Sequence, residues 1–181
     1  MSERTVVVTG ASRRLGLFLC EKFLAESWRV IALSRKASPE LENLHRESNG
    51  MLHTIEMGPI SAESIEASVG DIRNLTQSID VLIHNASIYE ADDSHCDNLD
   101  VFYQDLFQVH MSLPAQLNYS LEGALSSGDN PGNIIHITDI FSKNPSAKHI
   151  LYSSTKAGLE NLMKGFAKKL SPNIRVNSIQ P

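Results

Sequence analysis

Short runs of β-branched and other apolar residues alternate along the chain with longer stretches in which apolar residues recur every three or four positions. The short runs predict strands, and the longer stretches predict helices between them. The predicted strands are 5–9, 29–34, 51–56, 80–84, 133–138 and 174–179, and the predicted helices are 14–28, 39–49, 61–78, 98–127 and 149–170. In the longest helix, Pro114 predicts a bend or break.

The predicted strands are continuous apolar runs, which is typical of a parallel sheet covered on both faces. Right-handed crossovers place helices on both sides of such a sheet. We therefore predict a doubly wound, Rossmann-like α/β fold with three layers, α/β/α. With 181 residues and no linker or internal repeat, residues 1–181 are expected to form a single domain.

Composition excludes several classes of protein. The 21 acidic residues outnumber the 16 basic ones, and a formal charge of −5 argues against a nucleic-acid-binding face. No run reaches the roughly 18 apolar residues of a membrane span, and no signal-peptide core precedes the first strand. Cys20 and Cys96 lack the spacing of a metal site. We expect a cytoplasmic protein without a metal, nucleic-acid or membrane partner.

The junction after the first strand predicts a phosphate site. Residues 9–16 read Thr-Gly-Ala-Ser-Arg-Arg-Leu-Gly and lead into a helix. A glycine turn there lets backbone N–H groups reach a pyrophosphate, and the helix N-terminus adds favourable partial charge. The alternative is an ordinary turn with solvated arginines.

The end of the second strand indicates which dinucleotide is bound. In dinucleotide folds an acidic residue here binds the ribose hydroxyls of NAD, whereas an arginine pairs with the 2′-phosphate of NADP. Arg35 occupies this position, and no acidic residue follows before Glu40. NADP(H) is therefore favoured over NAD(H), unless Arg35 and Lys36 are a solvated loop pair.

A tyrosine and a lysine predict the chemical end of the site. Asp139 follows the fifth predicted strand, and Tyr152 and Lys156 lie one helical turn apart on one face. A lysine about 4 Å from a phenol stabilises the phenolate by on the order of 4 kcal/mol, or about three pKa units. The pair would then exchange protons near neutral pH. A snorkelling surface pair is the alternative.

Taken in order, these motifs resemble the short-chain dehydrogenase/reductase family over essentially the whole chain. The resemblance rests on Thr9-Gly-x-x-x-Arg14-x-Gly16, Asn85-Ala86-Ser87, Asp139, Tyr152, Lys156 and the run from Arg175 to Pro181. The chain is most similar to the pteridine reductase and dihydromonapterin reductase branch. Arg14 replaces a common glycine, Asp139 replaces the usual catalytic serine, and Tyr89 follows Ser87 by two positions.

The resemblance implies NADPH-dependent reduction of a dihydropterin, with dihydrofolate as a further candidate, to the tetrahydro form. The implied catalytic residues are Asp139, Tyr152 and Lys156. The implied cofactor contacts are Gly10, Ser12, Arg13, Arg14, Leu15, Gly16, Ser34, Arg35, Asn85, Ala86, Tyr152 and Lys156. The implied substrate contacts are Arg14, Ser87, Tyr89, Asp139 and Tyr152. Tyr89 would stack on the pterin, or else pack on the domain.

Three positions depart from the family pattern. His110 stands at the family's relay asparagine, where a relay role and a core histidine are both open. Gly58 replaces the aspartate that contacts adenine. The family continues past Pro181 into a seventh strand, so we expect this chain to be truncated at its C-terminus.

The long helices 98–127 and 149–170 imply, by the same resemblance, a homodimer or homotetramer. Two other functions compete with pterin reduction. One is reduction of a carbonyl substrate such as a 3-oxoacyl thioester, against which Asp139 argues. The other is a catalytically silent nucleotide-binding module.

Overall fold

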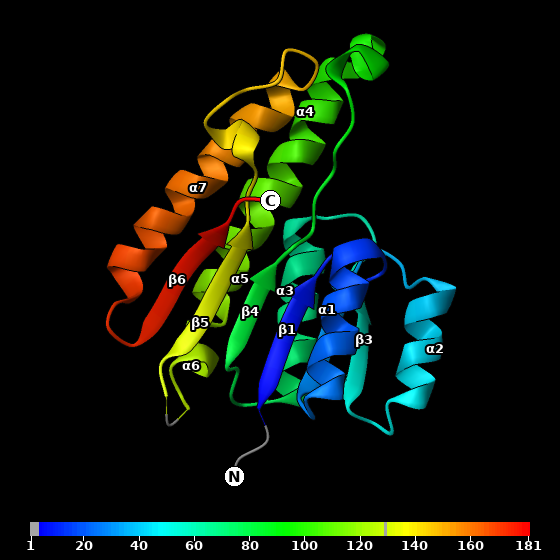
Figure 1. The fold of residues 1–181 in the computed structure, drawn as a ribbon, viewed down its shortest axis with the longest axis vertical. Coiled ribbons are helices and arrows are strands. Elements are labelled where there is room, and N and C mark those ends of the chain that lie inside the picture. Colours follow the sequence, from blue (N-terminus) through cyan, green and yellow to red (C-terminus); the bar gives the residue numbers. More distant parts are fainter. Residues whose placement is uncertain (1–3, 129) are drawn as a thin grey trace.

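Six parallel strands form one sheet in the order β3-β2-β1-β4-β5-β6 (Figure 1). The computed structural model describes residues 4–128 and 130–181. Met1–Glu3, which belong to the segment used to predict that no signal peptide is present, lie outside the described residues. The strands are β1 (Thr5–Thr9), β2 (Arg29–Ser34), β3 (Leu52–Glu56), β4 (Val81–His84), β5 (Gly132–Ile137) and β6 (Ile174–Ile179). The order reverses between β1 and β4, which confirms the predicted doubly wound sheet.

Helices cover both faces of the sheet (Figure 1). They are α1 (Arg14–Ala25), α2 (Pro39–Glu47), α3 (Ala62–Leu75), α4 (Leu99–Phe107), α5 (Leu113–Ser120), α6 (Glu122–Leu125) and α7 (Ile150–Leu170). Alternate strand residues point to opposite faces. Val6 and Val8 therefore pack with Cys20 of α1, whereas Val7 packs with residues of α3, α5 and α7. None of the helices described is long and apolar enough to cross a membrane.

The segment predicted as a helical stretch, 98–127, with a bend or break at Pro114, is helical over most of its length, and its irregular turn lies just before the proline. After a short 3₁₀ segment (Asp92–Asn98), α4 passes through a π-helical turn (Gln108–Ser112) into α5. Pro114 is the second residue of α5, where its missing N–H costs no helical hydrogen bond. The break therefore precedes the proline, and the chain changes its helical register there.

The turn between β1 and α1 is packed too closely for side chains. Gly10 has φ +66°, and a Cβ built there would lie 2.6 Å from the Ala86 Cα. A Cβ on Gly16 would lie 2.1 Å from the Gly10 carbonyl oxygen. Both glycines are therefore required sterically, and they bring the turn against the end of β4.

Buried polar side chains link β4 and β5 just below their carboxyl ends. His84 and His136 are register partners, and their rings lie 4.6 Å apart. His84 Nε2 lies 2.7 Å from Asn118 Oδ1, and Asn118 Nδ2 lies 3.4 Å from His136 Nε2. Burial lowers the pKa of His84 to about 4 and holds the pKa of His136 well below its usual range. Both imidazoles are therefore neutral at pH 7.

We predict that acid weakens the fold through this cluster. In the unfolded chain His84 regains a pKa near 6.5, so between pH 6.5 and about 4 the unfolded state binds a proton that the folded state does not. The free energy of unfolding should fall by about 3 kcal/mol over this window because of His84. Urea denaturation at a series of pH values measures it. In His84→Gln this part of the slope should disappear, and an unchanged slope would contradict the prediction.

We predict that Gly16→Ala destabilises the protein by about 1–3 kcal/mol, because the added methyl group collides with backbone. Gly70→Ala is the matched control. A Cβ at Gly70, inside α3, meets nothing within 4 Å, so this change should stabilise by about 0.5–1 kcal/mol. Thermal unfolding of the two variants gives the comparison, and equal melting temperatures would refute the steric argument.

Candidate active site

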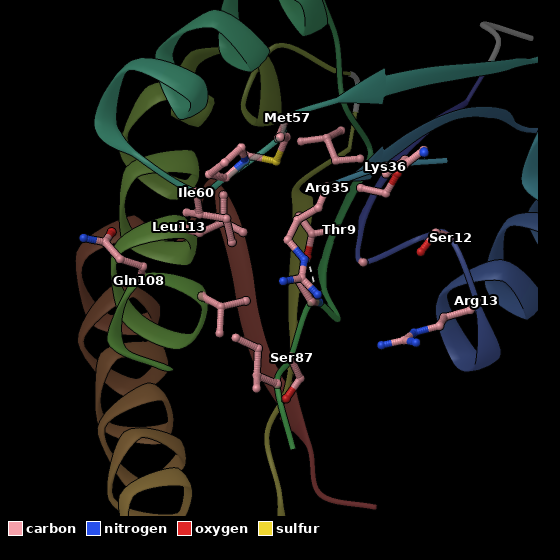
Figure 2. Close-up of a pocket in the computed structure, with 18 of the residues that line it drawn as sticks. Thr9, Ser12, Arg13, Arg35, Lys36, Met57, Ile60, Ser87, Gln108 and Leu113 are labelled. Atoms are coloured by element: carbon pink, nitrogen blue, oxygen red, sulfur yellow. Dashed lines mark hydrogen bonds between the residues drawn. The ribbon is translucent and has the colours of Figure 1, made fainter. Parts of the chain in front are cut away.

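A cavity of about 780 Å³ opens at the carboxyl ends of β1 and β2, beside the glycine turn. This is the point where the strand order reverses, and open α/β sheets bind their ligands there. Figure 2 shows Arg13 and Arg35 extending into the same space from different strand ends, with Ser87 beyond them. The cavity therefore brings together the glycine turn and Arg35, the two parts of the predicted nucleotide site, whereas Asp139, Tyr152 and Lys156 are not among its lining residues.

Six of the predicted cofactor contacts line this cavity: Gly10, Ser12, Arg13, Ser34, Arg35 and Ala86. Arg14 and Leu15 are exposed at the start of α1 and are not among its lining residues. Gly16 and Asn85 pack against the turn and are not among the lining residues. The Asn85 side-chain amide donates to the carbonyl oxygens of Thr9 and Gly10, each at 3.1 Å.

The lining fits a dinucleotide. The volume lies within the range of cofactor pockets. Gly10 and Ser12 of the turn and Arg13, the N-cap residue of α1, line the cavity, and the N-terminus of a helix is a place where anions bind. Two guanidinium groups supply positive charge for phosphates. Gly58, with φ +64° and open space around it, lines the wall where the resemblance expects an adenine-contacting aspartate.

Asp139 and Tyr152 meet next to this cavity. The Tyr152 hydroxyl donates to Asp139 Oδ2 at 2.7 Å, so β5 and α7 place a phenol and a carboxylate together. The other carboxylate oxygen accepts from the Phe141 N–H at 2.8 Å, which holds the aspartate in place. Tyr152 is almost completely buried. The structure thus brings two of the predicted catalytic residues into direct contact.

The electrostatics of Tyr152 differ from the sequence expectation. Burial, and then the hydrogen bond to Asp139, raise the pKa of Tyr152 far above its usual value, although a nearby lysine was expected to lower it. Lys156 Nζ donates to the Ile137 carbonyl oxygen at 2.9 Å and lies 5.6 Å from the centre of the Tyr152 ring. Burial lowers the pKa of Lys156 to about 8. The phenol therefore keeps its proton at neutral pH.

Tyr89 forms an aromatic wall beside the phenol. Its ring stacks on His149, with centres 4.4 Å apart and planes 8° from parallel, and meets the edge of the Tyr152 ring at 5.0 Å. About half of Tyr89 is exposed. A flat ring-shaped ligand would find an aromatic surface here.

His110 connects the predicted substrate residue Ser87 to α7. His110 Nε2 lies 2.9 Å from Ser87 Oγ, and Nδ1 lies 2.8 Å from Thr155 Oγ1. The ring packs edge-on against Tyr152, 5.4 Å between centres. His110 is fully buried, as expected of a core histidine, and it is also hydrogen-bonded to Ser87, as a relay role requires. The two interpretations are therefore compatible.

Glu160 supports the site and was missed by the sequence analysis. It accepts hydrogen bonds from Ser142, the residue after Phe141, and from Gln180 after β6, both at 2.7 Å. Lys164 pairs with its other oxygen at 3.1 Å. A signal was present, because Tyr152, Lys156 and Glu160 follow at intervals of four and share one face of α7.

Comparison with known proteins agrees with this geometry. A model of the short chain dehydrogenase family matches residues 4–181. Dihydromonapterin reductase of Klebsiella pneumoniae is 34% identical over 179 residues, which cover 98% of this chain and 73% of the relative. The dihydromonapterin reductase of Escherichia coli K12 is 32% identical over 177 residues, 97% of this chain and 72% of the relative.

Solved structures share the fold. A short-chain dehydrogenase from Streptomyces avermitilis superposes with a TM-score of 0.87 at 26% identity, covering 99% of this chain and 66% of the other. L-Sorbose reductase from Gluconobacter frateurii, solved with NADPH and L-sorbose, superposes with a TM-score of 0.88 at 24% identity, covering 100% of this chain and 70% of the other. The family match, the curated relatives and the fold together show that the chain belongs to the short-chain dehydrogenase family of nicotinamide-dependent oxidoreductases.

Proposed function

We propose that this protein reduces a dihydropterin to the tetrahydropterin with NADPH. The observation that carries the proposal is the hydrogen bond from Tyr152 to Asp139, which holds a protonated phenol close to Ser87, a residue that lines the dinucleotide-sized cavity. Curated relatives of 32–34% identity are dihydromonapterin reductases, and they support the same substrate class.

The nucleotide side of the site suits NADP(H). Gly10 and Ser12 would offer backbone to the phosphates, and Arg13 would add charge. Arg35 would hold the 2′-phosphate, since its guanidinium enters the cavity from the end of β2 and no acidic side chain replaces it there. The bound cofactor supplies hydride; the protein supplies position and a proton.

Tyr152 is the proposed proton donor. Reduction of a C=N bond adds a hydride to carbon and a proton to nitrogen. A buried phenol whose pKa is raised is protonated at neutral pH, so it has a proton to give to the ring nitrogen. Asp139 would orient the hydroxyl by accepting its hydrogen bond. Lys156, anchored on the Ile137 carbonyl oxygen, would keep positive charge behind the phenolate that forms.

The substrate side suits a flat heteroaromatic ring. Tyr89 is fixed from behind by its stack on His149, so it would offer an ordered ring face for a pterin. Ser87 would contact the polar edge of that ring. Arg14, which the resemblance implies at the same edge, starts from an exposed position on α1.

We predict that Tyr152→Phe and Asp139→Ala each lower kcat for dihydropterin by 10²- to 10⁴-fold, the usual contribution of a positioned proton donor. The Kd for NADPH should change less than threefold in both, because neither residue lines the nucleotide cavity. Stopped-flow oxidation of NADPH and fluorescence titration measure the two quantities. Asp139→Asn, which keeps an acceptor oxygen, is the control and should lose less than Asp139→Ala.

The same assay separates the competing functions. Dihydropterin and a 3-oxoacyl thioester are compared as substrates of the unaltered protein. Faster turnover of the thioester would favour carbonyl reduction, and NADPH binding without turnover of either would favour a silent nucleotide-binding module. Turnover of dihydropterin at the unaltered rate in both Tyr152→Phe and Asp139→Ala would refute the catalytic assignment.

We predict that Arg35→Ala weakens NADPH binding by about 10- to 100-fold, the value of a charge-assisted contact, and leaves NADH binding nearly unchanged. Arg46→Ala is the control, because Arg46 carries the same charge on the exposed side of α2. Calorimetric titration with both cofactors tests the prediction. Equal losses for NADPH and NADH would show that Arg35 does not read the 2′-phosphate.

A further inference from the structure

The π-helical turn between α4 and α5 places one imidazole between the nucleotide cavity and α7. Gln108 and Val109 line the cavity, whereas the next residue, His110, points to Thr155 and Tyr152. His110 is completely buried, and Thr155 is nearly so. The hydrogen bond of this ring to Thr155 is therefore made away from solvent, whereas its hydrogen bond to Ser87 lies at the edge of the cavity.

The proton positions follow from counting donors. A hydroxyl has one proton, and Thr155 donates its proton to the Tyr152 carbonyl oxygen at 2.8 Å. Thr155 Oγ1 is then an acceptor, so His110 Nδ1 must carry the proton that lies between them. A neutral imidazole carries only one N–H. Burial and the charge of Lys156 hold the pKa of His110 well below its usual value, so the ring is neutral and Nε2 is an acceptor.

Ser87 is the last member of this series of hydrogen bonds. Because His110 Nε2 has no proton of its own, the 2.9 Å hydrogen bond between them is donated by the Ser87 hydroxyl, which also lies within hydrogen-bonding reach of Tyr152. The oxygen of Ser87 then presents only lone pairs to the cavity that it lines. In the opposite arrangement Nε2 would donate to Ser87, and Thr155 would have to donate one proton to both Nδ1 and the Tyr152 carbonyl oxygen.

We propose that His110 is a positioning residue that fixes Ser87 as an acceptor, so that the site selects a substrate edge carrying an N–H donor. This inference rests on the proposed function only for the identity of the ligand, because amino and ring N–H groups line the polar edge of a pterin. A ligand that offers only acceptors at that edge would meet the lone pairs of Ser87 and be rejected. The selectivity thus comes from a residue that does not itself face the cavity.

The tautomer is tested first, without substrate. Nitrogen-15 NMR of the folded protein, with imidazole signals assigned by loss in single variants, reports which ring nitrogen is protonated. We expect His110 in the Nδ1–H form. The same counting assigns Nε2–H to His84 and Nδ1–H to His136 through Asn118, and these serve as internal controls. A His110 ring protonated at Nε2 would overturn the proposal, whatever the protein reduces.

The effect on binding is tested with a double-mutant cycle. The probe is biopterin, and calorimetry measures its Kd in the NADP⁺-loaded protein. Ser87→Ala and His110→Leu should each weaken binding about tenfold, and the double variant should be no weaker than either single variant. His110→Gln, whose side-chain oxygen can accept from Ser87, should restore binding to within about threefold. Circular dichroism checks that each variant folds.

Additive losses in the cycle, or His110→Leu binding as tightly as the unaltered protein, would contradict the proposal. Failure of the proposed function has a different signature. If biopterin binds with the expected cycle but dihydropterin is not reduced, the reductase assignment falls and the role of His110 stands. If the unaltered protein does not bind biopterin, recognition of a pterin edge by Ser87 is refuted.

Discussion

The side chain of Asn85 holds together the two central strands at the point where they part. β1 and β4 are neighbours, but the helices that follow them lie on opposite faces of the sheet, so a crevice opens between their ends. The amide of Asn85 donates to two successive carbonyl oxygens, those of Thr9 and Gly10. In return, Thr9 Oγ1 accepts from the backbone N–H groups of Asn85 and Ala86. These hydrogen bonds fix the position of the glycine turn relative to the Ser87 segment.

Burial rather than charge sets the chemistry of the phenol. The spacing of Tyr152 and Lys156 predicts an isolated pair, but in the fold both side chains are buried. Removing a phenol from water and giving it a carboxylate partner both favour its protonated form. Lys156 loses part of its effect because it is buried itself and bonded to a carbonyl oxygen. The Tyr152 phenol is therefore protonated at neutral pH, as the proposed proton donor must be.

Periodicity was sufficient to predict the sheet, because parallel strands covered on both sides are short apolar runs; those at Thr5–Thr9, Arg29–Ser34 and Ile174–Ile179 have the predicted bounds. It predicted the helical stretch 98–127 and a bend or break at Pro114, but not the π-helical turn at Gln108–Ser112, which keeps nearly the same apolar pattern as an α-helix. The buried cluster of His84 and His136 was also missed. Two strands each ending in an apolar run and a histidine were visible, but their pairing depends on register, which a single sequence does not show.

The sequence motifs indicated candidate site residues, but not the direction in which each side chain points. Motif spacing brought Asp139 and Tyr152 together correctly, whereas Arg14 and Leu15 lie outside the cavity because the start of α1 turns them outward. Self-association through α4 and α7 stays a prediction, although Val101, Phe107 and Ile150 are about half exposed on these helices.

The π-helical turn has a structural consequence. An α-helix would present residues 108 to 110 in a steady 100° progression, but the wider turn assigns neighbouring residues to two different compartments. Gln108 and Val109 line the nucleotide cavity, whereas His110 is hydrogen-bonded to Ser87. Three consecutive residues thus supply both a wall of the nucleotide cavity and the support of the Ser87 hydroxyl.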